Sequence, residues 1–485
     1  MKALLLSGSL AAALAACSVA PPYQRPADAP GTAYKETVPE SAQWKRADPS
    51  EALARGEWWT VFGDRKLDEL QAAAGAANPT LKAGLARLVQ ARAAAGLAES
   101  QRAPQVDAGA GLTRLRVSPA SLGLPAGADV PAQTLWRAQL SASYEVDLFG
   151  RVANTVAAAR ADLAQTEGLY RSLLLAIQGD VAQTYLTLRG LDAEAALLAD
   201  TVRLREEGLA LVDHRFKAGE IAELDVARAR TELATTRAER VALERRRAEL
   251  EHALAALIGR TPAEIDIEHR PLVFAPVAIP PGLPSELLER RPDIAAAEQA
   301  MAAANARIGV ARAAWFPRLT LTGLLGLEAA DSGDLFRVSS RTWALGPVAG
   351  TALAMTLFDG GRRAANEAGA RAAFDETAAE YRQTVLVAVR EVEDGLSGLR
   401  ILAQQAREQA DSVEAAQRAA ALSSARYRAG YVNYLEVIDA ERQVLATQRG
   451  LTQIERERAL ATVALVRALG GGWDAGPRAT TSPAR

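Results

Sequence analysis

The side chains that most often carry out chemistry are few and scattered in this 485-residue chain. Its three histidines, His214, His252 and His269, lack the spacing of metal ligands or of a general base beside a nucleophile. The run Gly470-Gly471-Gly472 follows the end of a predicted helix, where glycine is expected as a C-cap rather than as a phosphate-binding loop. We therefore expect no enzyme activity, no metal site and no cofactor.

The single cysteine, Cys17, indicates a different chemistry, because it follows an export signal directly. Lys2 supplies a positive charge, residues 3–13 form an apolar run, and Leu14-Ala15-Ala16 precedes the thiol. The arrangement resembles a bacterial lipobox, in which the cysteine is diacylated, becomes the mature N-terminus and is then N-acylated. The alternative is a plain signal peptide followed by an incidental cysteine.

The residues after Cys17 predict a tether rather than a folded domain. An Asp directly after the lipidated cysteine tends to retain lipoproteins in the inner membrane. Ser18 stands at this position here, so transfer of the protein to the outer membrane is possible. The stretch up to residue 50 is rich in Pro and Ala, as expected of an extended linker without a core. We expect a signal peptide over 1–16 and a lipidated tether over 17–50.

Composition narrows the class of protein further. The net charge of −2 argues against nucleic-acid binding. Apolar residues make up 49% of the chain but aromatic residues only 5%, and alanine dominates, which favours thin, closely packed helices. Beyond the first twenty residues no apolar run reaches the roughly 18–20 residues of a membrane helix, so any membrane crossing has to use strands.

Four segments show the alternation of half-buried strands. Residues 137–148 alternate strictly between polar and apolar side chains, and their length suits a tilted outer-membrane strand of about 9–11 residues. Weaker candidates are 106–117, 318–327 and 345–357. The alternative is a pair of soluble β-hairpins. Because four strands cannot close a barrel and open edges are not tolerated in lipid, three copies with twelve strands are expected.

Long helices are predicted by heptad repeats. Between Arg151 and Phe216 there is no proline, and apolar residues recur every seventh position. The first row comprises Leu174, Val181, Leu188, Ala195, Val202, Leu209 and Phe216. A second row of apolar residues, three positions after the first, is interrupted by Arg205. A helix of this length extends roughly 100 Å, which suits the periplasm better than a globular domain.

Each long helix is expected to turn at a glycine, Gly219 or Gly430, and to return as a shorter helix, about 222–258 or 433–469. Antiparallel hairpins favour a helical barrel over the alternative, a filamentous coiled coil. The two halves align without gaps, so we expect a tandem duplication. The predicted divisions after the tether are a first repeat over 51–260, a linker over 261–291, a second repeat over 292–472 and a disordered tail over 473–485.

The order of several short motifs resembles the outer membrane factors of tripartite efflux systems. This is the TolC-like family, and the resemblance favours its OprM/NodT-like lipoprotein branch, which works with resistance-nodulation-division (RND) pumps. It runs from Cys17 to about Trp473. The motifs that carry it are Pro21-Pro22-Tyr23, Trp58-Trp59, Glu145-Val146-Asp147-Leu148-Phe149-Gly150-Arg151, Gly282-Leu283-Pro284-Ser285-Glu286-Leu287-Leu288, Arg290-Arg291-Pro292-Asp293-Ile294 and Ala468-Leu469-Gly470-Gly471-Gly472-Trp473.

The resemblance implies an α+β membrane protein: a homotrimeric outer-membrane β-barrel with four strands per chain, continuous with a long periplasmic α-helical barrel and a mixed equatorial domain. Partners would be a periplasmic adaptor and an inner-membrane RND pump. The implied role is an exit duct for drugs or other small toxic compounds. A duct for type I protein secretion or heavy-metal efflux, and a purely structural envelope coiled coil, are the alternatives.

The family also implies a gate at the periplasmic tip. Leu435, Glu436 and Asp439 share one helix face, and three copies of Asp439 would form an acidic ring that favours cations. The alternative is that Glu436 and Asp439 only stabilise a helix N-terminus. Candidates for a latch that keeps the tip closed are Arg426, Tyr427, Arg428, Arg215 and Lys217. Val432 replaces the Arg that ties the tip in some members.

Overall fold

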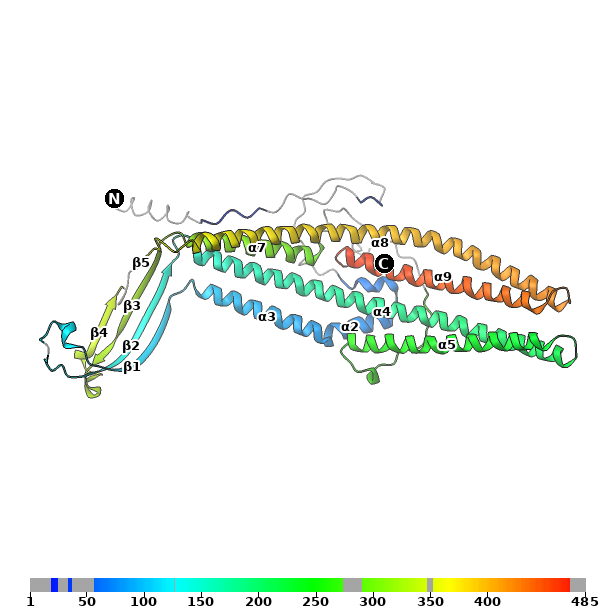
Figure 1. Cartoon of the computed structure of the whole chain (residues 1–485), viewed down its shortest axis with the longest axis horizontal. Helices are drawn as coiled ribbons and strands as arrows, with labels where there is room; N and C mark the ends of the chain where they lie inside the picture. Colours follow the sequence, from blue (N-terminus) through cyan, green and yellow to red (C-terminus); the bar gives the residue numbers. More distant parts are fainter. Residues whose placement is uncertain are drawn as a thin grey trace, which may run out of the picture. The chain divides into compact units, whose positions relative to one another are not determined.

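The computed structural model describes residues 19–24, 34–36, 56–125, 127–273, 290–346 and 352–471. The predicted signal peptide over 1–16, the predicted lipidation residue Cys17, most of the predicted tether, much of the predicted linker and the predicted tail over 473–485 lie outside this part. Helices and strands follow the order shown in Figure 1. Within the described residues, no helix combines the length and apolarity that a membrane crossing requires.

The chain divides into two compact units that cut across the two predicted repeats. The first unit comprises Met1–Pro26, Leu88–Thr166 and Ala297–Tyr381; the second comprises Ala27–Arg87, Glu167–Ala296 and Arg382–Arg485. Each unit therefore combines segments from both halves of the sequence. The strand over 133–146 in the first half pairs with the strand over 318–329 in the second, so the two halves of the sequence are not separate compact units.

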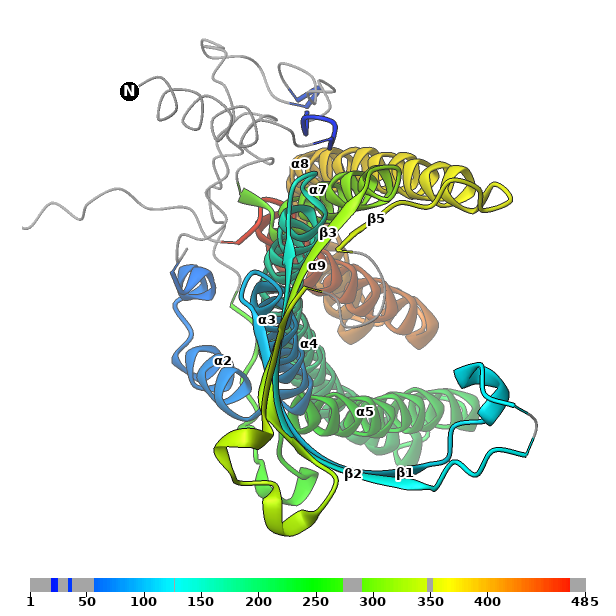
Figure 2. The same cartoon turned by 90° about the vertical axis from the view of Figure 1, so that its left-hand side faces the viewer.

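The first unit contains one antiparallel sheet in the order β1-β2-β3-β4. Figure 2 shows it as a single curved layer. Leu140 of β2 lies opposite Ala108 of β1 and Leu325 of β3, and Leu325 lies opposite Trp343 of β4. Because opposite residues share a face, the apolar positions form one continuous face. The bounds are β1 (Gln105–Leu115), β2 (Gln133–Val146), β3 (Arg318–Ala329) and β4 (Arg341–Leu345).

Three strand predictions are confirmed within a few residues, and the fourth is wrong. In place of one strand over 345–357, β4 ends at Leu345 and a short β5 (Leu353–Ala354) pairs separately with β3. Gly346 has φ +102°, which interrupts the extended backbone. The apolar alternation continued past this break and concealed it.

Two helical hairpins dominate the second unit (Figure 1). The first joins α4 (Arg151–Lys217) to α5 (Glu223–Leu257), and the second joins α8 (Arg362–Arg428) to α9 (Tyr434–Ala468). The returning helices agree with the predictions within one residue at each end. Shorter helices accompany the hairpins: α2 (Arg65–Ala77), α3 (Pro79–Ser100) and α7 (Pro292–Ala313).

The heptad positions of α4 are buried or partly buried, except for the one at its end. Val181, Leu188 and Leu198 have no exposed surface, but Phe216 is exposed. Phe216 lies in the last turn of α4. Around the buried positions, a core cluster includes Trp58, Trp59, Leu67, Tyr185, Leu254 and Val463.

A buried ionic network joins the middle of α4 to the last part of α5. Asp192 of α4 accepts hydrogen bonds from Arg189 at 3.1 Å and from Arg247 of α5 at 2.8 Å. It also accepts one from the backbone N–H of Arg270. The Asp192 side chain is only 1% exposed. Buried charges are tolerated when they are paired and hydrogen-bonded, so this network holds the segment after α5 against the hairpin.

Equivalent close contacts occur where the returning helices end. Gly259 follows α5 with φ +70°, and a Cβ there would lie 2.5 Å from the carbonyl oxygen of Ala77. Gly470 follows α9 with φ +85°, and a Cβ there would lie 2.7 Å from the carbonyl oxygen of Arg290. Only glycine satisfies both requirements at these positions, for conformation and for space.

Candidate functional site: the hairpin tips

Both hairpins turn through the same backbone geometry, at what we call the tips. Gly219 and Gly430 have φ +78° and +81°. The backbone N–H of Glu220 donates to the carbonyl of Arg215, and that of Tyr431 donates to the carbonyl of Arg426, each at 3.0 Å. This is the left-handed helix ending that glycine favours. Each turn therefore reverses the chain, so that the returning helix runs antiparallel to the long helix before it.

Arg215 connects the two tips. Its Nη1 donates to the carbonyl of Tyr427 at 3.4 Å, and its Nη2 donates to the carbonyl of Arg428 at 3.3 Å. The guanidinium carbon also lies 4.9 Å from the centre of the Tyr427 ring. A cation at the carbonyl end of a helix is stabilised by the helix dipole, and the ring face attracts it further. Arg215 of the first hairpin thus caps the last turn of α8 in the second.

Apolar contacts support this connection. The rings of Tyr427 and Tyr434 lie 5.4 Å apart, and both residues are buried. They pack with Val212 and Val226 of the first hairpin and with Val437 of the second. The Tyr427 hydroxyl is buried without a hydrogen-bond partner in the described residues. Such a group destabilises its surroundings, and a rearrangement that exposed it to water would remove this penalty.

The predicted gate residues lie on the accessible side of α9. Asn433 caps the helix by accepting from the backbone N–H of Glu436 at 3.3 Å. Leu435 and the Glu436 side chain are exposed. The Asp439 carboxylate accepts from Arg442 at 3.4 Å and remains 61% exposed. All three side chains are therefore available to line a passage.

The other predicted latch residues do not meet across the hairpins. Lys217 pairs with Asp213 of its own helix at 2.5 Å, and this ammonium lowers the pKa of Asp213. The side chains of Arg426 and Arg428 are exposed and contact no partner among the described residues. Arg428 contributes only its backbone carbonyl. Of the five predicted residues, the structure brings together Arg215 and Tyr427.

Three residues that the sequence did not single out form a charged junction near the tips. Glu232 of α5 pairs with Arg205 of α4 at 2.9 Å, and the Nε of Arg442 on α9 donates to Glu232 at 3.2 Å. Arg205 is 7% exposed and Glu232 12% exposed. One carboxylate therefore joins three helices. The lapse of the apolar pattern at Arg205 was the available signal.

A second junction repeats the pattern seven residues further along. Arg449 of α9 donates to Glu194 of α4 and to Glu239 of α5, each at 2.8 Å. Arg442 and Arg449 are one heptad apart, as are Glu232 and Glu239. Residues at this spacing lie on the same side of a helix. Two successive arginines of the second hairpin thus attach it to three glutamates of the first.

Burial perturbs two further groups beside the first junction. Burial raises the pKa of Glu441; nearby Arg205 opposes the rise, and nearby Glu232 adds to it. Burial raises the pKa of Tyr434 to about 12, and Glu441 contributes to the rise. The junction therefore contains a carboxyl group whose charged form is disfavoured. Among the described residues, no cluster of histidine, cysteine or acidic side chains could hold a metal ion.

A curved sheet with one apolar face, combined with paired helical hairpins and exposed acidic residues near their tips, is typical of an envelope channel. Comparison with known proteins defines the family. The model of the outer membrane efflux protein family matches residues 70–260 and 283–471. The chain belongs to this family. It is thus an outer membrane efflux channel component and not an enzyme, which confirms both predictions.

Three similar proteins illustrate the relationship. The chain is 35% identical to outer membrane protein OprJ of Pseudomonas aeruginosa over 474 residues, which cover 96% of this chain and 95% of that protein. It is 34% identical to the toluene efflux pump outer membrane protein TtgF of Pseudomonas putida, with 98% of each chain covered. The solved outer-membrane channel OprN superposes with a TM-score of 0.84 at 31% identity, covering 94% of this chain and 100% of that chain.

Proposed function

We propose that this protein is the exit duct of a tripartite efflux pump and passively conducts small toxic compounds across the outer membrane. The observation that carries the proposal is the pair of hairpin tips joined by Arg215 and by the Glu232–Arg442 contact. A duct that must stay closed until a pump engages it needs contacts that are strong enough to hold and weak enough to release. Partly exposed ion pairs have this property.

The proposed assembly is a trimer. Among the described strands, β1 and β4 each have only one partner, so each leaves an edge unpaired. Unpaired edges are not tolerated in lipid, and pairing of β1 with β4 of the next copy would remove both edges. Counting β4 and β5 as one strand, three chains would close a barrel of twelve strands. The continuous apolar face of the sheet would face lipid, and the double match to the family model supports the tandem duplication.

The proposed gate is formed by Leu435, Glu436 and Asp439 from three copies. Their exposure on α9 supports this role, because side chains that line a passage cannot be packed into the protomer core. Three Asp439 carboxylates would attract cations to the constriction. Arg215 and Tyr427 are the proposed latch within each protomer, and the exposed Arg426 and Arg428 are left for contacts with a neighbouring copy. In this proposal the turns at Gly219 and Gly430 point into the periplasm.

The proposed membrane anchor is a lipid on Cys17. The short described segment after it lies against α7. The carbonyl of Val19 accepts from Arg312 at 3.4 Å, and the carbonyl of Pro21 accepts from Asn305 at 3.0 Å. These contacts hold the start of the mature chain at a fixed place on the first unit. An acyl chain on the nearby cysteine would reinforce the attachment of that unit to the membrane.

The proposed partners are a periplasmic adaptor and an inner-membrane RND pump. The name of TtgF connects that protein with toluene, so a small apolar compound is the first cargo class to test here. The experiment compares dye accumulation and drug susceptibility in a strain that lacks the gene, in the complemented strain, and in one that carries a copy without residues 420–440. The proposal predicts higher accumulation and sensitivity, which only the complete gene reverses. Unchanged accumulation with loss of a secreted polypeptide, or with sensitivity to metal ions alone, would contradict it.

A further inference from the structure

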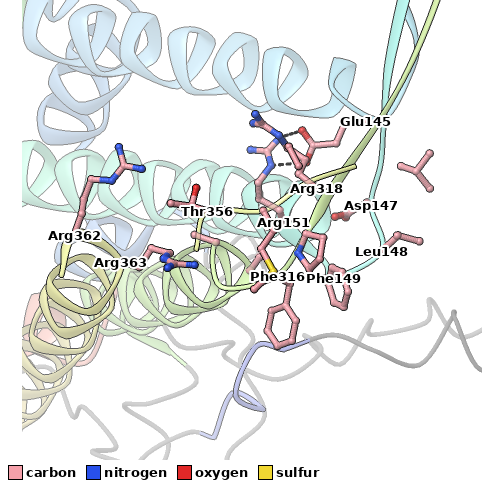
Figure 3. Close-up of a pocket in the computed structure, with 16 residues that line it drawn as sticks. Glu145, Asp147, Leu148, Phe149, Arg151, Phe316, Arg318, Thr356, Arg362 and Arg363 are labelled. Atoms are coloured by element: carbon pink, nitrogen blue, oxygen red, sulfur yellow. Dashed lines mark hydrogen bonds and ion pairs between the residues drawn. The ribbon is translucent and has the colours of Figure 1, made fainter. Parts of the chain in front are cut away.

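A cavity of about 340 Å³ lies in the first unit, where the sheet meets the helices that follow it. The end of β2, the start of β3 and the first residues of α4 and α8 contribute to its lining. Figure 3 shows Glu145, Arg151, Arg318 and Arg362 around this space. The cavity contains none of the gate or latch residues, so the proposed duct does not account for it.

The cavity has more positive than negative charge. Four arginines and two acidic residues line it, a difference of two positive charges: Arg151, Arg318, Arg362 and Arg363 against Glu145 and Asp147. Both acidic groups already have partners. Glu145 accepts two hydrogen bonds from Arg151, at 2.7 and 2.9 Å. Asp147 accepts from the backbone N–H groups of residues 152 and 153.

Two of the four guanidinium groups have no partner within the described part of the chain. Arg363 donates to Asp359 at 2.7 Å and lies 4.7 Å above the Trp315 ring. The side chains of Arg318 and Arg362 are exposed and contact no acceptor among the described residues. Unpaired guanidinium groups beside one cavity are suited to bind an anion with several oxygens, and phosphate fits the arginine fork best.

Apolar side chains surround this polar cavity. The rings of Phe149 and Phe316 stack 4.6 Å apart and at 20° to each other. Trp315 and Phe316 are each 40% exposed, and Leu357 and Phe358 are almost fully exposed. Exposed aromatic residues next to arginines are typical of the boundary between lipid and water. A free phosphate ion would use only the arginines, whereas a lipid would use both surfaces.

We propose that this cavity binds the phosphate headgroup of an anionic phospholipid, with Arg318 and Arg362 as the phosphate ligands. The acyl chains would lie along the exposed residues Phe316, Leu357 and Phe358. The attachment of the N-terminal segment supports this source of phosphate. Arg312, which holds the carbonyl of Val19, immediately precedes Ala313 in the cavity wall, so the proposed lipid anchor would enter the membrane beside the same site.

The test uses the full chain in vesicles of phosphatidylcholine that contain increasing amounts of phosphatidylglycerol with brominated acyl chains. Trp315 reports binding by the quenching of its fluorescence, which is obtained by subtracting the signal of Trp315→Phe. The variant pair Arg318→Gln with Arg362→Gln removes the proposed ligands. Arg407→Gln with Arg418→Gln removes the same charge from exposed positions of α8 and serves as the matched control.

Each arginine near a membrane surface is expected to favour the anionic lipid by about fivefold, so losing both weakens the preference by roughly 25-fold. The control pair and the charge-conserving pair Arg318→Lys with Arg362→Lys retain most of it. An equal preference in wild type and the glutamine pair overturns the proposal. Binding of inorganic phosphate by the detergent-solubilised protein, together with no preference for the anionic lipid in vesicles, overturns the lipid assignment. Conductance of the same samples reports the proposed duct separately.

Discussion

Replacing Arg442 by Gln removes the guanidinium that attaches α9 to Glu232 of α5. If opening separates the two hairpins, this contact exists only in the closed state, and its loss favours the open state. The Arg205–Glu232 pair lies within the first hairpin and is kept in both states. Arg442→Gln and Glu232→Gln should therefore raise the open probability equally, whereas only Glu232→Gln should lower thermal stability by leaving Arg205 buried without its carboxylate.

The size of the effect follows from the exposure of the pair. The Arg442 side chain is 56% exposed, so solvent screening limits the pair to about 0.2–1 kcal/mol. In the proposed trimer three such pairs separate together on opening. Their loss therefore favours the open state by roughly 0.6–3 kcal/mol in total, which raises the open-to-closed ratio by about 3-fold to 150-fold. The increase should shrink in high salt, because exposed charges are screened.

The assay is single-channel recording in planar bilayers, with thermal unfolding of the same samples. The double variant should resemble either single variant in open probability, because each single variant already removes the Glu232–Arg442 contact. Arg237→Gln is the matched control, since Arg237 pairs with Glu206 inside the first hairpin and both side chains are about half exposed. An unchanged open probability in Arg442→Gln, or an equal increase in Arg237→Gln, would refute the reasoning.

Three further predictions concern neighbouring groups. Arg215→Gln should raise open probability in bilayer recordings by removing the cap on α8, worth about 1 kcal/mol per protomer, while Lys217→Gln should not, because Lys217 pairs within α4. Glu441→Gln should raise the melting temperature at pH 7.5. Burial raises the pKa of Glu441 in the folded state, so its protonated form contributes stability that is complete below the unfolded pKa of about 4.3. This stability is lost as pH rises through the folded pKa. At pH 4 the glutamate is protonated, so the stability advantage of the Gln variant should vanish. Asp192→Asn should lower unfolding stability in urea by about 3–5 kcal/mol, since two arginines lose a buried carboxylate, whereas an effect of Glu249→Gln of similar size would contradict this explanation.

Periodic patterns in the sequence predicted the helices well. The heptad rows and the glycines at 219 and 430 located both returning helices within one residue, because long helices with one buried side leave a regular signal. The break in the strand at Gly346 was missed because it leaves no irregularity in the sequence pattern. The apolar alternation of residues 345–357 continued across it, and alternation reports the sides of a strand but not its continuity.

The charged junctions could not be predicted from the pattern. Glu232 and Arg442 are 210 positions apart in the chain, and a surface glutamate and a surface arginine look like any other charged residues of a helix. Only the packing of α5 against α9 brings them together. Arg215 was among the predicted latch residues, but the resemblance could not show that its acceptors are the backbone carbonyls at the end of α8.

The central claim is that the duct opens when its two hairpins separate. The most direct test is to join the hairpins covalently and to measure dye efflux. Cysteines at positions 232 and 442 would be linked in living cells by a short bifunctional thiol reagent, and each single cysteine variant would serve as control. We predict that linkage raises dye accumulation to the level of the strain without the gene, while the single variants efflux normally. Normal efflux through a fully linked protein would contradict this opening mechanism.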